Sequence, residues 1–333
     1  MAVSRMLSAK RPFRGRGSGR PHRSRFGRTP NDSRSGKKRG LQGGPGFDPR
    51  SMIEATLKQA CDMLEALVQE EPTNETYRLA LAQAQRHRLV HALRTGRESD
   101  ADKAFQAASK ISEKLVKDSP KNPKYMFELA DTLTMATTRL PSMQEQGTAE
   151  KHLNRAIQST QKLTTQFPKV SEYQLVLANA YGNLALVERT HGRLDEAETH
   201  YGLAQASMES LISDDSSIAL HQFSLAQTIK ELAELKRERG KQDDDRRQIE
   251  ASREILESAI LRFEPFVNQN QDALFGRRIV ASLYLSLAET SMELGDWEDA
   301  REANRNARRA SDQPWPSRFH RFDRRLHRPD GKA

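Results

Sequence analysis

We predict an all-α fold, a right-handed α-solenoid of stacked antiparallel helix pairs, from three observations. A motif recurs at one fixed interval, apolar residues within each copy have helical spacing, and glycine separates two such stretches in most copies. Repetition at one interval is typical of proteins in which successive helical units stack and bury a continuous core.

The recurring motif is a proline followed five residues later by tyrosine and then by Leu-Ala. It occurs as PTNETYRLALA from Pro72, as PKNPKYMFELA from Pro120 and as PKVSEYQLVLA from Pro168. A fourth copy, HQFSLA from His221, keeps Leu-Ala in the same phase. The chain therefore contains an internal repeat, and the interval from Pro72 to Pro120, equal to that from Pro120 to Pro168, is one repeat length.

Each copy is predicted to contain two helices joined by a tight turn. In the third copy, apolar residues three or four apart predict a first helix over 173–185 and a second over 194–211. Gly192 lies between them, and glycine readily adopts the left-handed backbone at a helix end. Gly96 and Gly240 keep the same phase, so we expect turns there too.

The second helices combine small and large side chains at fixed positions. Small residues let two helices approach to about 8–10 Å, because the ridge of one enters the groove of the other. The positions that repeat are Ala101, Ala149 and Ala197; Phe105, Leu153 and Tyr201; Ala108, Ala156 and Ala204; and Leu115, Leu163 and Leu211.

The array continues with a shifted phase and begins with half a unit. Residues 280–300 repeat the pattern of 177–197, but they lie seven residues beyond two full repeat lengths, so seven residues have been inserted. We expect them in a loop over 241–248, between Gly240 and the next helix. Ile53, Leu57, Ala60 and Leu67 lie one repeat length before second-helix positions. The run Gly-Gly-Pro-Gly at 43–46 argues against a helix ahead of them.

The charge distribution divides the 333-residue chain into three parts. The net charge is +9, but residues 1–50 alone carry +12 (14 Lys and Arg against Asp32 and Asp48). We predict a disordered, Arg/Gly-rich basic tail over 1–49, a repeat domain of half a unit plus about five repeats over 50–312, and a basic capping helix or tail over 313–333.

The repeat resembles the tetratricopeptide repeat (TPR) over residues 50–312. The likeness is carried by Tyr181, Leu184, Ala185, Gly192 and Ala197, and by their counterparts Tyr284, Leu287, Ala288, Gly295 and Ala300. The standard repeat has about 34 residues and is shorter than the repeat length of this chain, so longer helices are expected here. The long form is similar to arrays attached to Ser/Thr protein kinases in bacteria, although this sequence contains no kinase motif.

The first two copies depart from the pattern. Gln85 and Arg88 replace large apolar residues, and Pro141 precedes a lengthened turn around Gly147. These copies are expected to pack less regularly.

The resemblance implies a peptide-binding groove along the first helices. The positions it marks are Arg86, His87, Val90 and Arg94 in the first copy; Asn179, Asn183, Leu186 and Arg189 in the third; Lys230, Glu231, Glu234 and Glu238 in the fourth; and Glu289, Met292 and Glu293 in the fifth. Such a groove runs from basic to acidic, and the amide of Asn183 offers both a donor and an acceptor to a peptide backbone. The alternative for each residue is an ordinary solvated helix face.

The two tails suggest other contacts. Arginine binds phosphates and stacks on bases, so the tail arginines are candidates for binding RNA or another polyanion: Arg14, Arg16, Arg20, Arg23 and Arg25. The alternatives are a solubilising tail, or translated sequence upstream of the true start. At the other end, Trp315, Phe319, Phe322 and Leu326 predict a face that caps the last repeat, with partner or membrane-surface contact as the alternative.

The sequence favours a non-catalytic protein. His87 and His91 are four residues apart, but no third metal ligand is nearby and arginines flank His87. No nucleophile–base pair is evident, so we expect no catalytic residue, cofactor, metal or small-molecule substrate. A single cysteine, the lack of an apolar signal segment and the lack of a membrane-spanning run indicate a cytoplasmic protein.

Two functions follow from these observations. The first is a scaffold that binds a protein or peptide partner on the face of the first helices. The second is association with nucleic acid or another polyanion through the N-terminal tail.

Overall fold

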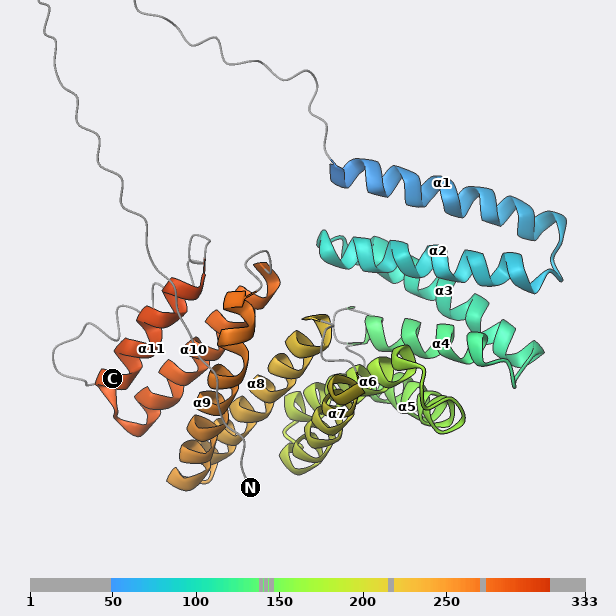
Figure 1. The fold of residues 1–333 in the computed structure, drawn as a ribbon. Helices are drawn as coiled ribbons and strands as arrows, with labels where there is room; N and C mark the ends of the chain where they lie inside the picture. The colour runs from blue at the N-terminus through green and yellow to red at the C-terminus, as the bar shows by residue number, and fades with distance from the viewer. Residues whose placement is uncertain are drawn as a thin grey trace, which may run out of the picture. The chain divides into compact units, whose positions relative to one another are not determined.

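The computed structural model describes residues 49–137, 140, 143, 147–214, 219–269 and 274–311, and these ranges form eleven helices without a strand. The predicted all-α fold is therefore confirmed. In chain order the helices are α1 (Pro49–Glu70), α2 (Glu75–Arg94), α3 (Glu98–Asp118), α4 (Pro123–Ala136), α5 (Thr148–Gln166), α6 (Ser171–Thr190), α7 (Leu194–Asp214), α8 (Ala219–Gln242), α9 (Arg246–Gln269), α10 (Leu274–Leu294) and α11 (Trp297–Ala310) (Figure 1).

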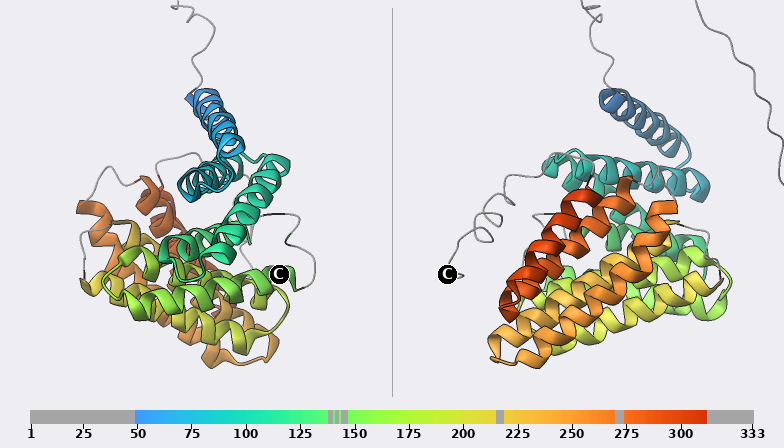
Figure 2. Two further views of the ribbon diagram at one scale, coloured as in Figure 1. Left: turned by 90° about the vertical axis from the view of Figure 1, so that its right-hand side faces the viewer. Right: turned by 60° about the vertical axis from the view of Figure 1, so that its left-hand side comes forward.

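The helices form five pairs, α2/α3 to α10/α11, preceded by α1. Each helix packs against the next one along the chain, as a solenoid requires, and the helices follow one another in space in the same order (Figures 1 and 2). The first helix of each pair also contacts the first helix of the next pair, whereas the second helices of neighbouring pairs have at most marginal contact in the described ranges. The first helices α2, α4, α6, α8 and α10 thus form the inner row.

The motif prolines lie in the short connections just before the first helices. Asn74 caps α2, since its side chain accepts hydrogen bonds from the backbone N–H groups of Thr76 and Tyr77. Asn122 accepts one from Lys124 at the start of α4, where Pro123 takes a position that needs no N–H donor. The recurring proline therefore marks the start of the three pairs that begin with α2, α4 and α6.

Glycine makes the turn inside three of the helix pairs in the same way. Gly96, Gly192 and Gly295 have φ values of +71°, +76° and +85°, a region that residues with a Cβ rarely adopt. The next backbone N–H returns to a carbonyl five residues earlier: Arg97 to Ala92, Arg193 to Glu188 and Asp296 to Ser291, each at 2.9 Å. This is the Schellman arrangement that closes a helix end.

The loop predicted over 241–248 is found only at 243–245, and the turn predicted at Gly240 is wrong. Helix α8 continues through Gly240 to Gln242, and α9 begins at Arg246. Asp244 makes the turn instead, with φ +52°, and the Asp245 N–H reaches the Gly240 carbonyl at 2.8 Å. The seven inserted residues lengthen the two helices rather than the loop between them.

The alanines predicted to lie between helices are buried. Ala101, Ala108, Ala156, Ala197 and Ala204 all have 0% exposure. The large residues that accompany them are also buried: Phe105, Leu153, Tyr201, Leu115, Leu163 and Leu211. The small and large positions of the repeat therefore form the seam between successive helices.

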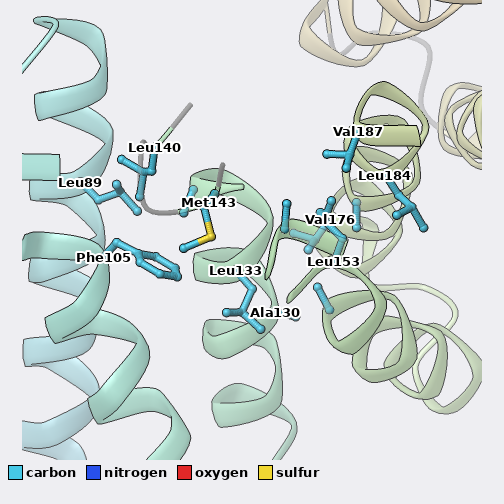
Figure 3. Packing of buried hydrophobic residues seen from close by; sticks show 14 of the residues in the cluster. Leu89, Phe105, Ala130, Leu133, Leu140, Met143, Leu153, Val176, Leu184 and Val187 are labelled. Carbon is cyan, nitrogen blue, oxygen red and sulfur yellow. The ribbon is translucent and has the colours of Figure 1, made fainter. Parts of the chain in front are cut away.

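The second copy has a short first helix and a long connection. Helix α4 ends at Ala136 and α5 begins after Gly147, which has φ +81°. Leu140 and Met143 of this connection are buried in the core cluster with Leu89 and Phe105 (Figure 3). These two side chains anchor the connection in the apolar core.

At Gln85 and Arg88, polar contacts to α1 and within α2 take the place of apolar packing. Gln85 is buried, and its Nε2 donates to Glu65 Oε1 at 3.2 Å, while Arg88 Nη1 donates to Gln85 Oε1 at 3.2 Å. The expected irregularity of the first copy therefore takes the form of a hydrogen-bonded contact. None of the described helices is long and apolar enough to cross a membrane.

Candidate functional site

The inner row carries a charged surface where α6, α8 and α10 meet. Arg189 lies near the end of α6, and Glu231, Glu234 and Glu238 lie on α8. Because helical residues three or four apart share a face, the three carboxylates point to the same side of α8. The repeat thus brings one cation of α6 opposite a row of anions on α8.

Arg189 binds all three glutamates. Its Nε lies 2.7 Å from Glu238 Oε2, and its Nη1 lies 3.2 Å from Glu231 Oε2 and 3.6 Å from Glu234 Oε2. Burial lowers the pKa of Arg189. The hydrogen bond to Glu238 and the nearby carboxylates raise it by a larger amount, so the net pKa lies above the ordinary value. Arg189 is therefore held as a permanent cation in a fixed position.

Glu234 connects this cluster to α10. Lys230 Nζ lies 2.7 Å from its Oε1, and Ser286 Oγ of α10 donates to the same atom at 2.7 Å. Burial raises the pKa of Glu234, yet Lys230, Ser286 and Arg189 outweigh burial and bring the pKa below its ordinary value. Glu234 is thus ionised at neutral pH and fully engaged within the protein.

Two further ion pairs join α8 to α10. Arg237 Nη1 lies 2.6 Å from Glu289 Oε2, and Lys241 Nζ lies 2.8 Å from Glu293 Oε1. On the α10 side, 43% of the Glu289 side chain and 34% of the Glu293 side chain are accessible. The carboxylates of α10 are therefore available to solvent and to a ligand.

A cavity of about 500 Å³ opens between these three helices. It is lined by Arg189, Glu234, Arg237, Glu238, Lys241, Gln242, Glu289, Met292 and Glu293. Six of these nine residues are groove positions predicted from the sequence: Arg189, Glu234, Glu238, Glu289, Met292 and Glu293. Of the other predicted positions in these copies, Glu231 and Lys230 pack beside Glu234.

The groove positions of the first copy lie apart from this cavity. Arg86 of α2 contacts two buried carboxylates of α4: its Nε lies 2.8 Å from Glu128 Oε1, and its Nη1 lies 2.9 Å from Asp131 Oδ2. The charge of Arg86 is therefore paired within the protein, whereas the side chains of His87 and Arg94 are exposed.

Asn183 also has a partner within the chain. Its Nδ2 donates to the Thr134 carbonyl of α4 at 2.8 Å, which joins the first helices of adjacent pairs. Asn179, one turn earlier on α6, is exposed. A contact between Asn183 and a peptide stays a prediction, and it has to coexist with this internal hydrogen bond.

Sequence reasoning missed the residues that position the predicted ones. Arg237, Lys241, Glu128 and Asp131 were not among the predicted groove positions. A signal was present, since Arg86 and Glu128 are 42 residues apart, as are Arg189 and Glu231. Opposite charges separated by almost one repeat length are candidates for pairs between neighbouring first helices.

Several candidate residues cannot be placed. The tail arginines Arg14, Arg16, Arg20, Arg23 and Arg25 lie outside the described residues, as do Trp315, Phe319, Phe322 and Leu326. Within the described ranges, no group of three His, Cys, Asp or Glu side chains is arranged to hold a metal ion.

Comparisons with known proteins give low similarity. No protein-family model matches the sequence, and no curated protein matches it significantly.

The comparison with solved structures finds, among others, three proteins whose own chains are matched over almost their whole length. A thermophilic TPR protein from Thermus thermophilus is 16% identical, with a TM-score of 0.36 over 67% of this chain and 98% of its own. A tetratricopeptide repeat protein from Parabacteroides merdae ATCC 43184 is 15% identical, with a TM-score of 0.37 over 83% of this chain and 93% of its own. Nro1, a hypoxic regulator of sterol synthesis and nuclear import adaptor, is 10% identical, with a TM-score of 0.37 over 83% of this chain and 99% of its own. Because these values are low, the assignment of a helical repeat fold rests on the helix order and contacts of this chain itself.

Proposed function

We propose that this protein is a non-catalytic scaffold that holds an extended segment of a protein partner on the face of its inner helices. The cavity between α6, α8 and α10 is the anchor point, and it accepts a cationic side chain of the partner. The observation that carries the proposal is a cavity whose lining comes from three successive repeat units and coincides with the groove positions of the TPR resemblance.

The charges of the cavity favour a cationic ligand. Its lining holds four glutamates against two arginines and one lysine. The two guanidinium groups are less accessible than Glu289, since the side chains of Arg189 and Arg237 are 19% and 17% exposed, whereas Glu289 is 43% exposed. The third cation, Lys241, is 52% exposed but is already paired with Glu293. A ligand that enters therefore meets carboxylate oxygens, which form short charge-assisted hydrogen bonds with arginine or lysine.

The internal ion pairs make the site rigid before a ligand arrives. Arg189 and Glu234 each contact several partners at once, so little side-chain entropy is lost when a peptide binds against them. The lining contains no histidine, cysteine or serine that could act as nucleophile or base. The chemistry of the cavity thus suits recognition rather than turnover.

The test is selection of peptides from a random ten-residue display library on the full chain. We expect enriched peptides to carry arginine or lysine at a fixed position, and their affinity to fall about tenfold or more in the double variant Glu289→Gln/Glu293→Gln, the typical loss for a charge-assisted contact. The matched control is Glu254→Gln/Glu257→Gln, which removes the same charge from exposed positions of α9. Enriched peptides without a basic residue, or equal losses in both variants, would contradict the proposal.

The second candidate function is polyanion association through the N-terminal tail, favoured by the charge of +12 on residues 1–50 (14 Lys and Arg against two Asp). It predicts that binding to single-stranded RNA falls steeply with added salt, because bound counterions are released. Removal of residues 1–48 is expected to abolish RNA binding while leaving peptide binding intact. RNA binding that survives this truncation would exclude the tail as its source.

A further inference from the structure

Helix α1 has two apolar sides, but only one of them is covered. Cys61 is buried, and Leu57, Leu64 and Val68 are partly buried on the side that carries the Glu65 contact to Gln85 of α2. The other side shows Met52, Ile53, Met63 and Leu67 with exposures of 52%, 51%, 61% and 36%. In Figures 1 and 2, α1 lies at the end of the helical series, with α2 as its neighbour.

The second helices of the other units show which element packs on the equivalent side. Ile53 and Leu67 lie one repeat length before Ala101 and Leu115, both of which have 0% exposure in α3. A second helix such as α3 is covered on both sides, by the first helix of its own pair and by that of the next pair. Helix α1 has the sequence of such a second helix and contacts only the next first helix, α2, to a substantial extent. Its open side therefore corresponds to the surface on which the first helix of the same pair packs in the other units.

Between Met52 and Leu67 the open side is also free of charge, and Glu70 in the last turn of α1 is the first charged residue beyond this strip on the same face. With about 100° of rotation per residue, the residues at 52, 53, 55, 56, 59, 60, 63, 66 and 67 share one broad face, and all of them are apolar, small or uncharged. The charged residues of this stretch, Glu54, Lys58, Asp62 and Glu65, lie on the remaining circumference. At 1.5 Å per residue the uncharged strip is roughly 24 Å long.

We propose that this strip binds the same strip of a second copy, forming a two-fold symmetric pair of antiparallel α1 helices. Ile53 and Leu67 each lie seven residues from Ala60. An axis at Ala60 therefore places Ile53 of each copy against Leu67 of the other. Alanine at the crossing point allows close approach of the two helices. A symmetric interface brings each residue near its own counterpart, and an uncharged strip avoids the repulsion that this would otherwise cause.

The sequence argues against the segment directly before α1 as the occupant. The segment directly before α1 contains Gly43, Gly44, Pro45 and Gly46, the residues least suited to a helix. A second copy supplies a helix of matching length and pattern without such a connection. This pairing is independent of the peptide site, because it uses α1 rather than α6, α8 and α10.

The first test is the mass of the full chain in solution, by sedimentation equilibrium from about 1 to about 300 μM, since a two-helix interface is at the small end of interface sizes. We expect a concentration-dependent dimer. Met63→Glu should yield a monomer over the whole range, whereas Leu261→Glu should leave the dimer unchanged. Leu261 is the matched control because it is an equally apolar, 79% exposed residue on α9.

The second test is oxidative cross-linking at the proposed axis. Ala60→Cys is expected to form a disulfide-linked dimer, because two Cβ atoms meet at the crossing point. Lys58→Cys, on the opposite side of α1, should not cross-link. A monomer at every concentration, a dimer that survives Met63→Glu, or equal cross-linking of both cysteine variants would overturn the proposal, as would a different protein found seated on the strip.

Discussion

Two tyrosines at equivalent positions of different helix pairs make the same kind of contact. Gln161 Nε2 donates to the Tyr181 hydroxyl at 2.6 Å, and the Tyr284 hydroxyl donates to Glu264 Oε2 at 2.9 Å. Burial and the Glu264 carboxylate raise the pKa of Tyr284 to about 12. The position in the repeat fixes which residues meet, and the residue type then decides which of them donates.

Asp131 is the residue whose ionisation bears most directly on stability. It shares Arg86 with Glu128 in a buried site, and burial, opposed by Arg86, raises its pKa from 3.8 to about 6. The folded protein therefore holds this proton more tightly than the unfolded chain does. Its contribution to stability is full below about pH 4 and is lost as the pH rises through about 6.

We predict that Asp131→Asn flattens the dependence of stability on pH between 5 and 7.5. The amide oxygen still accepts from Arg86, but no charge has to be buried. The variant therefore lacks the gain of about 1–1.5 kcal/mol that the native protein makes between pH 7.5 and 5, which is about half of the full effect reached below about pH 4. Thermal unfolding at several pH values measures this difference.

The control for this prediction is Asp118→Asn. A hydrogen bond from Arg78 lowers the pKa of Asp118, so this group loses its stabilising effect only at more acidic pH, and the slope between pH 5 and 7.5 should not change. Equal slopes in the native protein and in Asp131→Asn would contradict the assignment of the pKa of about 6.

At the scale of elements, the seven-residue insertion is divided between two helices. Helix α8 has 24 residues where α6 has 20, and α9 has 24 where α7 has 21. Four residues on one helix and three on its antiparallel partner add about one turn to each. The apolar faces of the two helices therefore stay in register.

The lengthened hairpin places Asp244 where other pairs have glycine. We predict that Asp244→Gly stabilises the protein by about 0.5–1 kcal/mol, because a residue with a Cβ is strained in the left-handed backbone that Asp244 adopts at φ +52°. Chemical denaturation measures the change. Asp243→Gly removes the same charge at a residue without positive φ and should not stabilise. A gain of equal size in both variants would show that charge, rather than backbone conformation, is responsible.

Gly240 is required for a different reason. A Cβ at this position would lie 2.6 Å from Ile249 Cγ1 and 2.8 Å from the Asp245 carbonyl oxygen, so the two helices could not stay as close as they are. We predict that Gly240→Ala costs about 1–3 kcal/mol. Gly202→Ala, in an open helical position of α7, should instead stabilise by about 0.5–1 kcal/mol. Denaturation midpoints of the two variants that move in the same direction would refute this reading of Gly240.

The error at Gly240 shows what the sequence can and cannot predict. The spacing of alanine, leucine and tyrosine was enough to predict the helices, because the buried seam between helices recurs in every copy of the repeat. The glycine at the same phase suggested a turn, but a glycine serves equally well where two backbones come close. Only the contacts of Ile249 and Asp245 distinguish the two uses, and these depend on three-dimensional packing.

At the scale of the repeat domain, polar contacts along the inner row link successive pairs. Arg86 joins α2 to α4, Asn183 joins α4 to α6, Arg189 joins α6 to α8, and Arg237 joins α8 to α10. The groove positions could be predicted because they follow the repeat. Their partners could not, because each pair of helices uses a different combination of charges.

The apolar core is divided along the chain into separate clusters of buried residues. One cluster contains Leu89, Leu133 and Leu153, and another contains Leu225, Leu256 and Leu283. Residues of α6 and α7 belong to both groups, since Tyr181 and Ala204 are in the first and Ala178 and Met208 in the second. A solenoid of this kind is stabilised by contacts between neighbouring units, so damage in one cluster should stay partly local.

We therefore predict that truncating a single leucine reduces the protection of backbone amides against hydrogen exchange more in some helices than in others. Leu133→Ala, which removes a side chain with 1% exposure and costs about 2–5 kcal/mol, should speed amide hydrogen exchange in α3, α4 and α5 more than in α9, α10 and α11. Leu256→Ala, in the other cluster, should give the reverse pattern. Mass spectrometry of peptic fragments resolves these segments. A uniform increase across all helices in both variants would mean that the array unfolds as one cooperative unit, and the nearest-neighbour account of its stability would be wrong.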